Sequence, residues 1–298
     1  MLTPDFIREG DKIAIVSTAR KIDIKEIEDA MYILKQWNLV PVVGSTIGIE
    51  SNQFAGTDED RRSDFQKMLD DKEIKAIWCA RGGYGTVRII DDIDFSNFRT
   101  HPKWIIGYSD ITVLHSHLHN LGICSLHAPM PIDIHKGTKE SIDIVRDITF
   151  GKNIEYKIPS SKKNILGDCR GQLVGGNLSM LYSLCGSSSS LDTTGKILCI
   201  EDLDEYLYHI DRMLQNLKRN GYFDNLSGLI VGGMTKMHDN NIPFGKKPKQ
   251  IILDIVQEYG FPVAFKFPMG HIEDNRALIF GAKASLKVTK DEVKLVYV

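Results

Sequence analysis

The chain has 298 residues, of which 42% are hydrophobic and 26% are charged, a composition typical of a soluble globular protein with one large or two ordinary domains. Its net charge of −2 argues against a protein that binds nucleic acid or an anionic membrane, because either partner requires an excess of basic residues. Two local basic clusters, Lys162-Lys163 and Lys246-Lys247-Pro248-Lys249, contain no interleaved aromatic residues and are typical of solvated loops.

Cysteine usage and the N-terminal sequence indicate the cellular compartment. The chain has 5 cysteines and no C-x-x-C motif, and the apolar surroundings of Cys79 and Cys199 predict buried thiols in a reducing compartment. The first residues lack the basic and then apolar segments of a signal peptide. No apolar run approaches the ~20 residues that span a bilayer. We therefore expect a cytoplasmic protein.

Strands and helices alternate in the first half of the chain. Short apolar runs predict strands at 11–18, 39–43, 74–80 and 103–106, and the apolar segment 123–127 follows. Periodicity and helix-start residues predict helices at 24–37, 57–71, 86–92 and 111–120. This alternation predicts a parallel sheet covered on both faces, with ligands at the carboxyl ends of its strands. The loops after Ala80 and Ile106 are therefore candidates for one shared site.

The character of the chain changes at a polar segment, 159–169, which we interpret as a linker between two domains. Beyond it, a glycine-rich segment at 171–178 leads into an apolar helix at 178–184. Further patterns predict strands at 195–200 and 226–231, helices at 203–220 and 250–259, and a β-hairpin at 284–298.

The segment 103–115 combines a short apolar strand, a sharp turn at Gly107-Tyr108 and an amphipathic helix. This arrangement would hold Ser109 at the carboxyl end of a sheet, beside a helix N-terminus that favours negative charge, as in a nucleophile elbow. Ile111 stands where the usual G-x-S-x-G pattern has its second glycine. The alternative interpretation is that Ser109 or Asp110 caps the helix.

The segment Arg81-Gly82-Gly83-Tyr84-Gly85 lies between a predicted strand and a predicted helix. Its glycines would let the backbone approach a ligand and expose N–H groups that bind a phosphate or the oxyanion of a tetrahedral intermediate. The segment matches neither G-x-G-x-x-G nor the phosphate loop that ends in Lys-Ser/Thr. A tight turn between strand and helix is the alternative.

Two further segments carry candidate catalytic groups. Glu201 and Asp202 directly follow a predicted strand, where a carboxylate could orient a histidine; the alternative is the acidic start of a helix. His271 follows Met269-Gly270 at a strand end, and a loop histidine is the commonest general base. The alternative for His271 is an ordinary surface residue.

Three histidines, His115, His117 and His119, lie in one predicted helix, and the first and last are four residues apart. The helix lacks the Glu of H-E-x-x-H, and no third ligand matches it. We therefore expect partly exposed helix histidines and no metal site.

Taken in chain order, these motifs resemble the LD-carboxypeptidase family of serine peptidases, which includes muropeptide LD-carboxypeptidases and microcin C self-immunity peptidases. The resemblance extends over nearly the whole chain. It is carried by the segments 10–16, Arg61, 77–85, 106–112, 175–178, 200–202, 208–213 and 270–271. One departure follows His127, where Ala128-Pro129 replaces the Gly-Pro of the family.

The resemblance implies an α/β fold with two domains. Residues 1–155 would form an N-terminal parallel-sheet domain with a nucleophile elbow, similar to class I glutamine amidotransferases. Residues 168–298 would form a C-terminal mixed α/β domain with a β-rich end. The active site would lie in the cleft between the two domains.

The resemblance also assigns roles to residues. It implies a catalytic triad of Ser109 as nucleophile, His271 as general base and Glu201 as the carboxylate that orients it. It implies an oxyanion hole formed by the backbone N–H groups of Gly83 and Asp110. Arg81 and Asn177 are candidate contacts to the substrate's terminal carboxylate, although Arg81 could instead pair with a local acid. No cofactor is implied.

The family's substrate is a murein tetrapeptide, cut between the L-centre of a diamino acid and a terminal D-Ala. We therefore predict a homodimeric peptidase of peptidoglycan recycling. One alternative is a peptidase that inactivates microcin C-type aminoacyl-nucleotide antibiotics. Those relatives carry tryptophans near the Gly-Gly-Asn segment, whereas Trp37, Trp78 and Trp104 lie elsewhere. A non-catalytic peptide-binding relative and a metal hydrolase are further alternatives.

Overall fold

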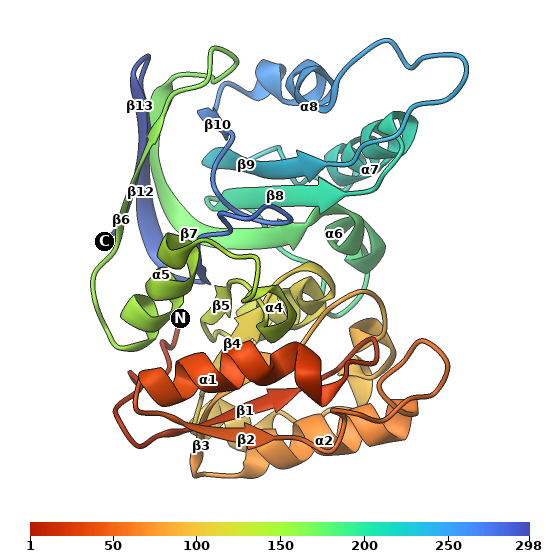
Figure 1. Ribbon diagram of the computed structural model, residues 1–298. Coiled ribbons are helices and arrows are strands. Elements are labelled where there is room, and N and C mark those ends of the chain that lie inside the picture. The colour runs from red at the N-terminus through yellow and green to blue at the C-terminus, as the bar shows by residue number, and fades with distance from the viewer.

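Two β-sheets organise the chain, and the computed structural model describes residues 1–298 around them (Figure 1). The first sheet has the strand order β11-β5-β4-β3-β1-β2. Its strands are β1 (Lys12–Val16), β2 (Val40–Val43), β3 (Ile74–Cys79), β4 (Trp104–Gly107), β5 (Ser125–His127) and β11 (Leu278–Phe280). The first five strands are parallel, which confirms the predicted parallel sheet, and β11 pairs antiparallel to β5.

Both faces of the first sheet are covered, as the near-continuous apolar strands require. Along β1, Ile13 and Ile15 point into one core, and Ala14 and Val16 point into another. The helices of this half are α1 (Glu28–Gln36), α2 (Asp58–Asp70), α3 (Ser96–Thr100), α4 (Thr112–Asn120) and α5 (Lys139–Thr149). In Figure 1, α1 and α2 lie on opposite sides of β1, and their buried residues belong to the two different cores.

The helix predicted at 86–92 is wrong in type, because the structure forms two short 3-10 turns there, Thr86–Arg88 and Ile90–Asp92. Thr86, Val87, Ile89 and Ile90 are β-branched residues, which disfavour an α-helix. The remaining 3-10 turns are Ile24–Ile27, Ser109–Ile111, Pro131–Asp133 and Gln257–Tyr259.

The second sheet is mixed and has the order β10-β9-β8-β7-β12-β13-β6. Its strands are β6 (Glu155–Pro159), β7 (Gly167–Asn177), β8 (Ile197–Leu203), β9 (Gly228–Thr235), β10 (Val263–Phe265), β12 (Lys283–Val288) and β13 (Glu292–Tyr297). The hairpin of β12 and β13 confirms the predicted β-rich end. The long strand β7 pairs parallel with β8 and antiparallel with β12, so it joins the two parts of the sheet.

Three helices cover one face of the second sheet: α6 (Leu178–Leu184), α7 (Leu207–Arg219) and α8 (Pro248–Val256). Helix α7 begins four residues later than predicted, because β8 continues to Leu203 and Asp204 then adopts a left-handed φ of 60°. The polar segment interpreted as a linker between two domains is instead a connection within the second sheet, since residues 160–166 join β6 to β7 and both strands belong to that sheet.

The other face of the second sheet packs against the first half of the chain. Cys199 of β8 and Ile230 of β9 share one continuous core with Ile13, Trp78 and Ile106 of the first sheet. The short strand β11 also crosses from the second half of the chain to the edge of the first sheet. The two halves are therefore joined through a common apolar core. No helix combines the length and the apolar character needed to cross a bilayer.

Candidate active site

The turn after β4 holds Ser109 in an unusual backbone conformation. Ser109 has a φ of 64°, in the left-handed region, which costs a residue with a Cβ about 1–2 kcal/mol. Neither Ser109 nor Asp110 caps the following helix with its side chain, so the capping alternative is wrong. Strained residues of this kind persist where the surrounding structure fixes them, most often at functional sites.

The loop after β3 lies directly against this turn. A Cβ added to Gly82 would come within 3.1 Å of the Ser109 Cβ and within 3.2 Å of both its Oγ and the backbone nitrogen of Asp110. A side chain at this position would push the neighbouring atoms back by a few tenths of an ångström, so glycine suits the close approach of the two loops. The loops after Ala80 and Ile106, which the sequence predicts to share one site, therefore lie side by side.

Glu201 and His271 form a hydrogen-bonded pair. The Glu201 side chain, at the end of β8, is fully buried, and its Oε2 accepts hydrogen bonds from Nδ1 of His271 at 2.7 Å and from the His271 backbone N–H at 3.1 Å. This pairing fixes the tautomer of His271 with its proton on Nδ1, which leaves Nε2 without a partner within the chain. The helix-start alternative for Glu201 is therefore wrong.

The pair shifts the pKa of each partner. Burial alone would raise the pKa of Glu201, but the charge and hydrogen bond of His271 outweigh burial and lower it. Burial alone would lower the pKa of His271, but the Glu201 carboxylate outweighs burial and raises it above its ordinary value. Glu201 therefore stays ionised, and the imidazolium form of His271 is stabilised.

Asn177 holds Glu201 from its other side and is itself bound to Asp202. The Asn177 amide donates to Glu201 Oε1 at 3.3 Å and to Asp202 Oδ1 at 3.0 Å, and its carbonyl oxygen accepts the Met180 N–H at the start of α6. Asp202 also accepts the backbone N–H groups of Ser179 and Leu203. Burial and the neighbouring Glu201 charge raise the pKa of Asp202 to about 7.

One cavity of about 470 Å³ collects most of the residues selected from the sequence. Those that line it are Arg81, Gly83, Ser109, Asp110, Asn177 and His271, whereas Glu201 lies buried behind His271. No hydrogen bond joins Ser109 Oγ to His271 in this structure. Arg81 is half-buried and donates from Nη1 to the backbone oxygen of Lys21 at 3.0 Å, so it forms no ion pair with a local acid.

Sequence reasoning missed several neighbours of these groups. The ring of Tyr108 lies over His271, with centroids 4.7 Å apart, and Asp133 and Lys136 line the same cavity. Tyr108 precedes Ser109 in the predicted turn, so its position could have been inferred. Asp133 lies in a 3-10 turn with no recognisable motif, and nothing in the sequence indicates its place.

The side chain of Asp110 points away from the cavity, into the protein. Its Oδ2 accepts the backbone N–H of Thr86 at 2.9 Å, and Oδ1 is buried without a partner. Burial raises the pKa of this carboxyl. The side chain thus ties the Ser109 turn to the loop after β3, in addition to the role predicted for its backbone.

Two of the three helix histidines bind separate partners, and Nδ1 of the third, His119, is buried without one. His115 is buried between the Ser125 hydroxyl, 2.8 Å from Nδ1, and the Gly107 carbonyl, 2.9 Å from Nε2. His117 contacts the Ser189 hydroxyl at 3.0 Å. His115 is thus a buried residue rather than the partly exposed one expected, and it supports the strand that carries the Ser109 turn.

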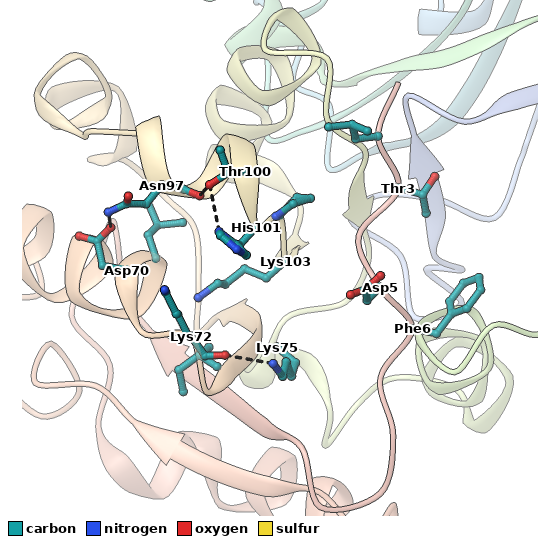
Figure 2. Close-up of a pocket in the computed structure, with 14 residues that line it drawn as sticks. Thr3, Asp5, Phe6, Asp70, Lys72, Lys75, Asn97, Thr100, His101 and Lys103 are labelled. Atoms are coloured by element: carbon teal, nitrogen blue, oxygen red, sulfur yellow. Dashed lines mark hydrogen bonds between the residues drawn. The ribbon is translucent and has the colours of Figure 1, made fainter.

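A larger cavity of about 750 Å³ lies at the opposite, amino ends of β3 and β4 (Figure 2). Several of its polar groups are already bound within the chain: Lys103 Nζ donates to the backbone oxygens of Met68 and Asp71, and Asn97 donates to Asp70. Because ligands of such sheets bind at the carboxyl ends of the strands, the smaller cavity around Ser109 is the candidate active site.

Comparisons with known proteins identify the family of the chain. The model of the LD-carboxypeptidase N-terminal domain matches residues 13–128, and that of the LD-carboxypeptidase C-terminal domain matches residues 170–286. A probable murein peptide carboxypeptidase of Bacillus subtilis is 36% identical, over 96% of this chain and 92% of that protein. A murein tetrapeptide carboxypeptidase of Pseudomonas aeruginosa is 25% identical, over 93% of each chain.

Solved structures show the same fold. A muramoyltetrapeptide carboxypeptidase from Oxalobacter formigenes superposes with a TM-score of 0.88 at 26% identity, over 96% of this chain and 98% of that chain. The microcin C7 self-immunity protein in complex with aspartyl sulfamoyl adenosine gives a TM-score of 0.89 at 20% identity, over 99% and 98% of the two chains, and shows the fold alone. The chain belongs to the LD-carboxypeptidase family and is a serine carboxypeptidase.

Proposed function

We propose that the protein hydrolyses the bond between the L-diamino acid and the terminal D-Ala of murein tetrapeptides, through a triad of Ser109, His271 and Glu201. One observation carries this proposal. His271 is bound through Nδ1 to the buried Glu201, and it lines the same cavity as the strained Ser109. This is the arrangement that a general base needs in order to activate a serine hydroxyl.

In the proposed reaction, His271 Nε2 takes the Ser109 proton as Oγ attacks the carbonyl carbon of the diamino acid. The same proton then passes to the leaving nitrogen of D-Ala, and an acyl-enzyme on Ser109 remains. A water molecule, deprotonated by His271, hydrolyses the acyl-enzyme and restores the serine. Glu201 stabilises the imidazolium in both steps and does not itself take the proton.

The turn at Ser109 acts as a nucleophile elbow in this proposal, and the backbone N–H groups of Gly83 and Asp110 form the oxyanion hole. The Gly83 N–H donates to no acceptor within the chain. The Asp110 nitrogen faces the same loop, 3.2 Å from where a Gly82 Cβ would lie. Each aligned donor would lower the reaction barrier by about 3 kcal/mol.

Substrate recognition follows from the charges around the cavity. Arg81 is the proposed partner of the terminal D-Ala carboxylate, since a guanidinium binds a carboxylate with two parallel hydrogen bonds. Asn177 lines the same cavity, but its amide groups already bind Glu201, Asp202 and the start of α6. We therefore assign Asn177 a positioning role beside any contact it makes with substrate.

The cellular setting is also part of the proposal. Residues 1–155 and 168–298 are the two proposed domains, with the cavity between them. We propose a cytoplasmic homodimer that acts in peptidoglycan recycling. The free thiols of Cys79, Cys124 and Cys199, all buried, suit a reducing compartment. The dimer rests on the family resemblance.

The alternative within the family is cleavage of aminoacyl-nucleotide antibiotics, as the microcin C7 neighbour suggests. The structure offers no tryptophan to stack on a base in the cavity: Trp78 and Trp104 are buried in the core, and Trp37 stacks on Trp78. This observation favours the muropeptide substrate.

The test compares substrates on the purified protein. A tetrapeptide ending in L-Lys-D-Ala or diaminopimelate-D-Ala should release free D-Ala, while aspartyl sulfamoyl adenosine should remain intact. Preferential cleavage of the nucleotide would establish the alternative. Tight peptide binding without release of D-Ala would identify a non-catalytic relative, and activity that is lost to a chelator and restored by zinc would identify a metal hydrolase.

A further inference from the structure

Five lysines from three separate segments line one cavity of about 700 Å³ at the edge of the second sheet. We call it the basic cavity; its lysines are Lys163, Lys246, Lys247, Lys249 and Lys266. The two basic clusters of the sequence, interpreted as separate solvated loops, thus come together here. No acidic side chain lines the cavity, and its apolar lining residues include Val231, Met234, Phe267 and Ile272.

Most of this positive charge has no acidic partner. Lys246 pairs with Asp254 at 2.6 Å, and Lys163 donates to the neutral Gln250 side chain at 2.9 Å. Lys247, Lys249 and Lys266 form no ion pair. In a chain with a net charge of −2, such a concentration of one sign is a local feature that repels itself and attracts anions.

Two of the five lysines, Lys163 and Lys266, lie on segments that are joined by hydrogen bonds. Lys266 lies between two fully buried residues, Phe265 and Phe267, whose N–H groups bind Asn164 Oδ1 at 2.8 Å and the Val231 carbonyl at 3.1 Å. The Asn164 contact also joins the Lys163 loop to the same strand. The fold therefore holds the backbone at Lys163 close to the backbone at Lys266.

The basic cavity is separated from the active site by one intermediate cavity. Ile272, which follows His271, lines both the basic cavity and an intermediate cavity of about 540 Å³. That intermediate cavity shares Tyr108, Asp133 and His271 with the cavity around Ser109. A ligand that occupies the active site and extends past His271 and Ile272 would point toward the lysines.

We propose that the basic cavity is a subsite for a multiply charged anion that bears phosphate or carboxylate groups. The anion is either an extension of the peptide substrate remote from the scissile bond or a separate small molecule. If the anion is part of the peptide substrate, this inference rests on the proposed peptidase function. If it is a separate small molecule, it does not, because binding of a free anion needs no catalysis.

The first arm of the test measures kcat/KM for two matched substrates. Both contain the same tetrapeptide ending in D-Ala, and both are extended at its amino end by a glycine linker. Three glutamates precede the linker in one peptide, and three glutamines precede it in the other. Wild-type protein should prefer the glutamate peptide by roughly five- to tenfold at low salt. This ratio should approach one in Lys247→Ala/Lys266→Ala. It should persist in Lys247→Arg/Lys266→Arg and in the control Lys287→Ala/Lys290→Ala, whose lysines are exposed on the β12–β13 hairpin.

The second arm measures binding of inorganic pyrophosphate by calorimetry. If wild-type protein cuts the two peptides with equal kcat/KM and binds pyrophosphate, and the alanine variant does not bind pyrophosphate, the ligand is a separate anion. Equal kcat/KM values without pyrophosphate binding would overturn the inference. If neither peptide is cut, the proposed peptidase function fails, and the calorimetric comparison of wild type with the alanine variant alone decides the anion subsite.

Discussion

Gly270 lies so close to Glu201 that a Cβ at this position would come within 2.3 Å of the carboxylate oxygen Oε2. This is the oxygen that binds Nδ1 of His271, the next residue in the chain. The backbone N–H of Gly270 is in turn held by Asn275 Oδ1 at 2.7 Å. The backbone at Gly270 therefore packs directly against Glu201, and this contact, which leaves no room for a side chain, places the proposed base His271 beside its carboxylate.

Gly270→Ala should reduce kcat by roughly 100-fold or more, because the new methyl group must displace Glu201 from His271. Gly260→Ala is the matched control, since Gly260 also has a left-handed φ, of 76°, but has no atom within 4 Å of an added Cβ. The control should lose about 1 kcal/mol of stability and keep its activity. Comparable activity in both variants would mean that the contact with Glu201 does not matter.

Replacing Ser109 separates its chemistry from its backbone strain. Ser109→Ala and Ser109→Gly should both reduce kcat by about 10⁴-fold or more, because each lacks the proposed nucleophile. The glycine variant should be more stable than the alanine variant by about 1 kcal/mol, since only glycine accepts a φ of 64° without strain. Activity assays and urea unfolding measure the two effects. Ser183→Ala, an exposed serine of α6, should change neither, and substantial activity in Ser109→Ala would rule out the triad.

The Glu201–His271 pair predicts the pH dependence of activity. The general base must be neutral, and Glu201 raises the pKa of His271, so kcat/KM should rise with pH through a value above 6.5. In Glu201→Gln this limb should move to lower pH, while kcat falls by about 10³- to 10⁴-fold. A pH profile that does not shift in Glu201→Gln would contradict the pairing.

The same pair contributes to stability over a defined pH range. The His271 contribution is fully present below its unfolded pKa of 6.5 and is lost as pH rises through the higher folded value. The Glu201 contribution is present above its unfolded pKa of 4.5 and is lost as pH falls through the lower folded value. The difference in melting temperature between wild type and His271→Ala should therefore be largest between pH 4.5 and pH 6.5. A difference that stays constant from pH 4 to 9 would contradict this prediction.

Asn177→Ala tests whether this residue positions Glu201 or binds substrate. Loss of its cap on α6 and of its bonds to two buried carboxylates should reduce stability by about 2 kcal/mol. If Asn177 acts by positioning, kcat should fall more than KM rises. A large increase in KM with kcat unchanged would instead show direct binding.

Arg81→Gln tests recognition of the terminal carboxylate. For wild type, converting the D-Ala carboxylate of the substrate to an amide should reduce kcat/KM by roughly 10- to 100-fold, because a charge-assisted hydrogen bond is lost. The variant should cut acid and amide at similar rates, since it has no guanidinium to distinguish them. If the variant still discriminates as strongly as wild type, another residue binds the carboxylate.

Local patterns predicted those parts of the structure that depend on local geometry. The start of α2 could be predicted because Thr57 and Asp60 form a reciprocal cap, and the turn at Gly107-Tyr108-Ser109 because its strand, turn and helix are adjacent in sequence. The pairing of Glu201 with His271 could not be derived from the residues alone, since 70 positions separate them. It was obtained from the family resemblance.

Other features are determined by contacts that the sequence does not display. Strand β11 has three residues, too few for a periodic pattern, and it exists because β5 offers it a free edge. The late start of α7 reflects the continuation of β8 beside β9 up to Leu203. The two lysine clusters looked like unrelated solvated loops, because only the folded chain places Lys163 beside Lys249 and Lys266.

The crossing of β11 to the first sheet also governs when activity can appear during protein synthesis. The edge of the first sheet at β5 is closed by Leu278–Phe280, and the proposed base, His271, is only seven residues ahead of this strand. A nascent chain that ends before this strand has an unpaired sheet edge and no anchored histidine. On the ribosome, the proposed nucleophile is thus made long before its proposed partners, and the site is complete only after β11 has emerged.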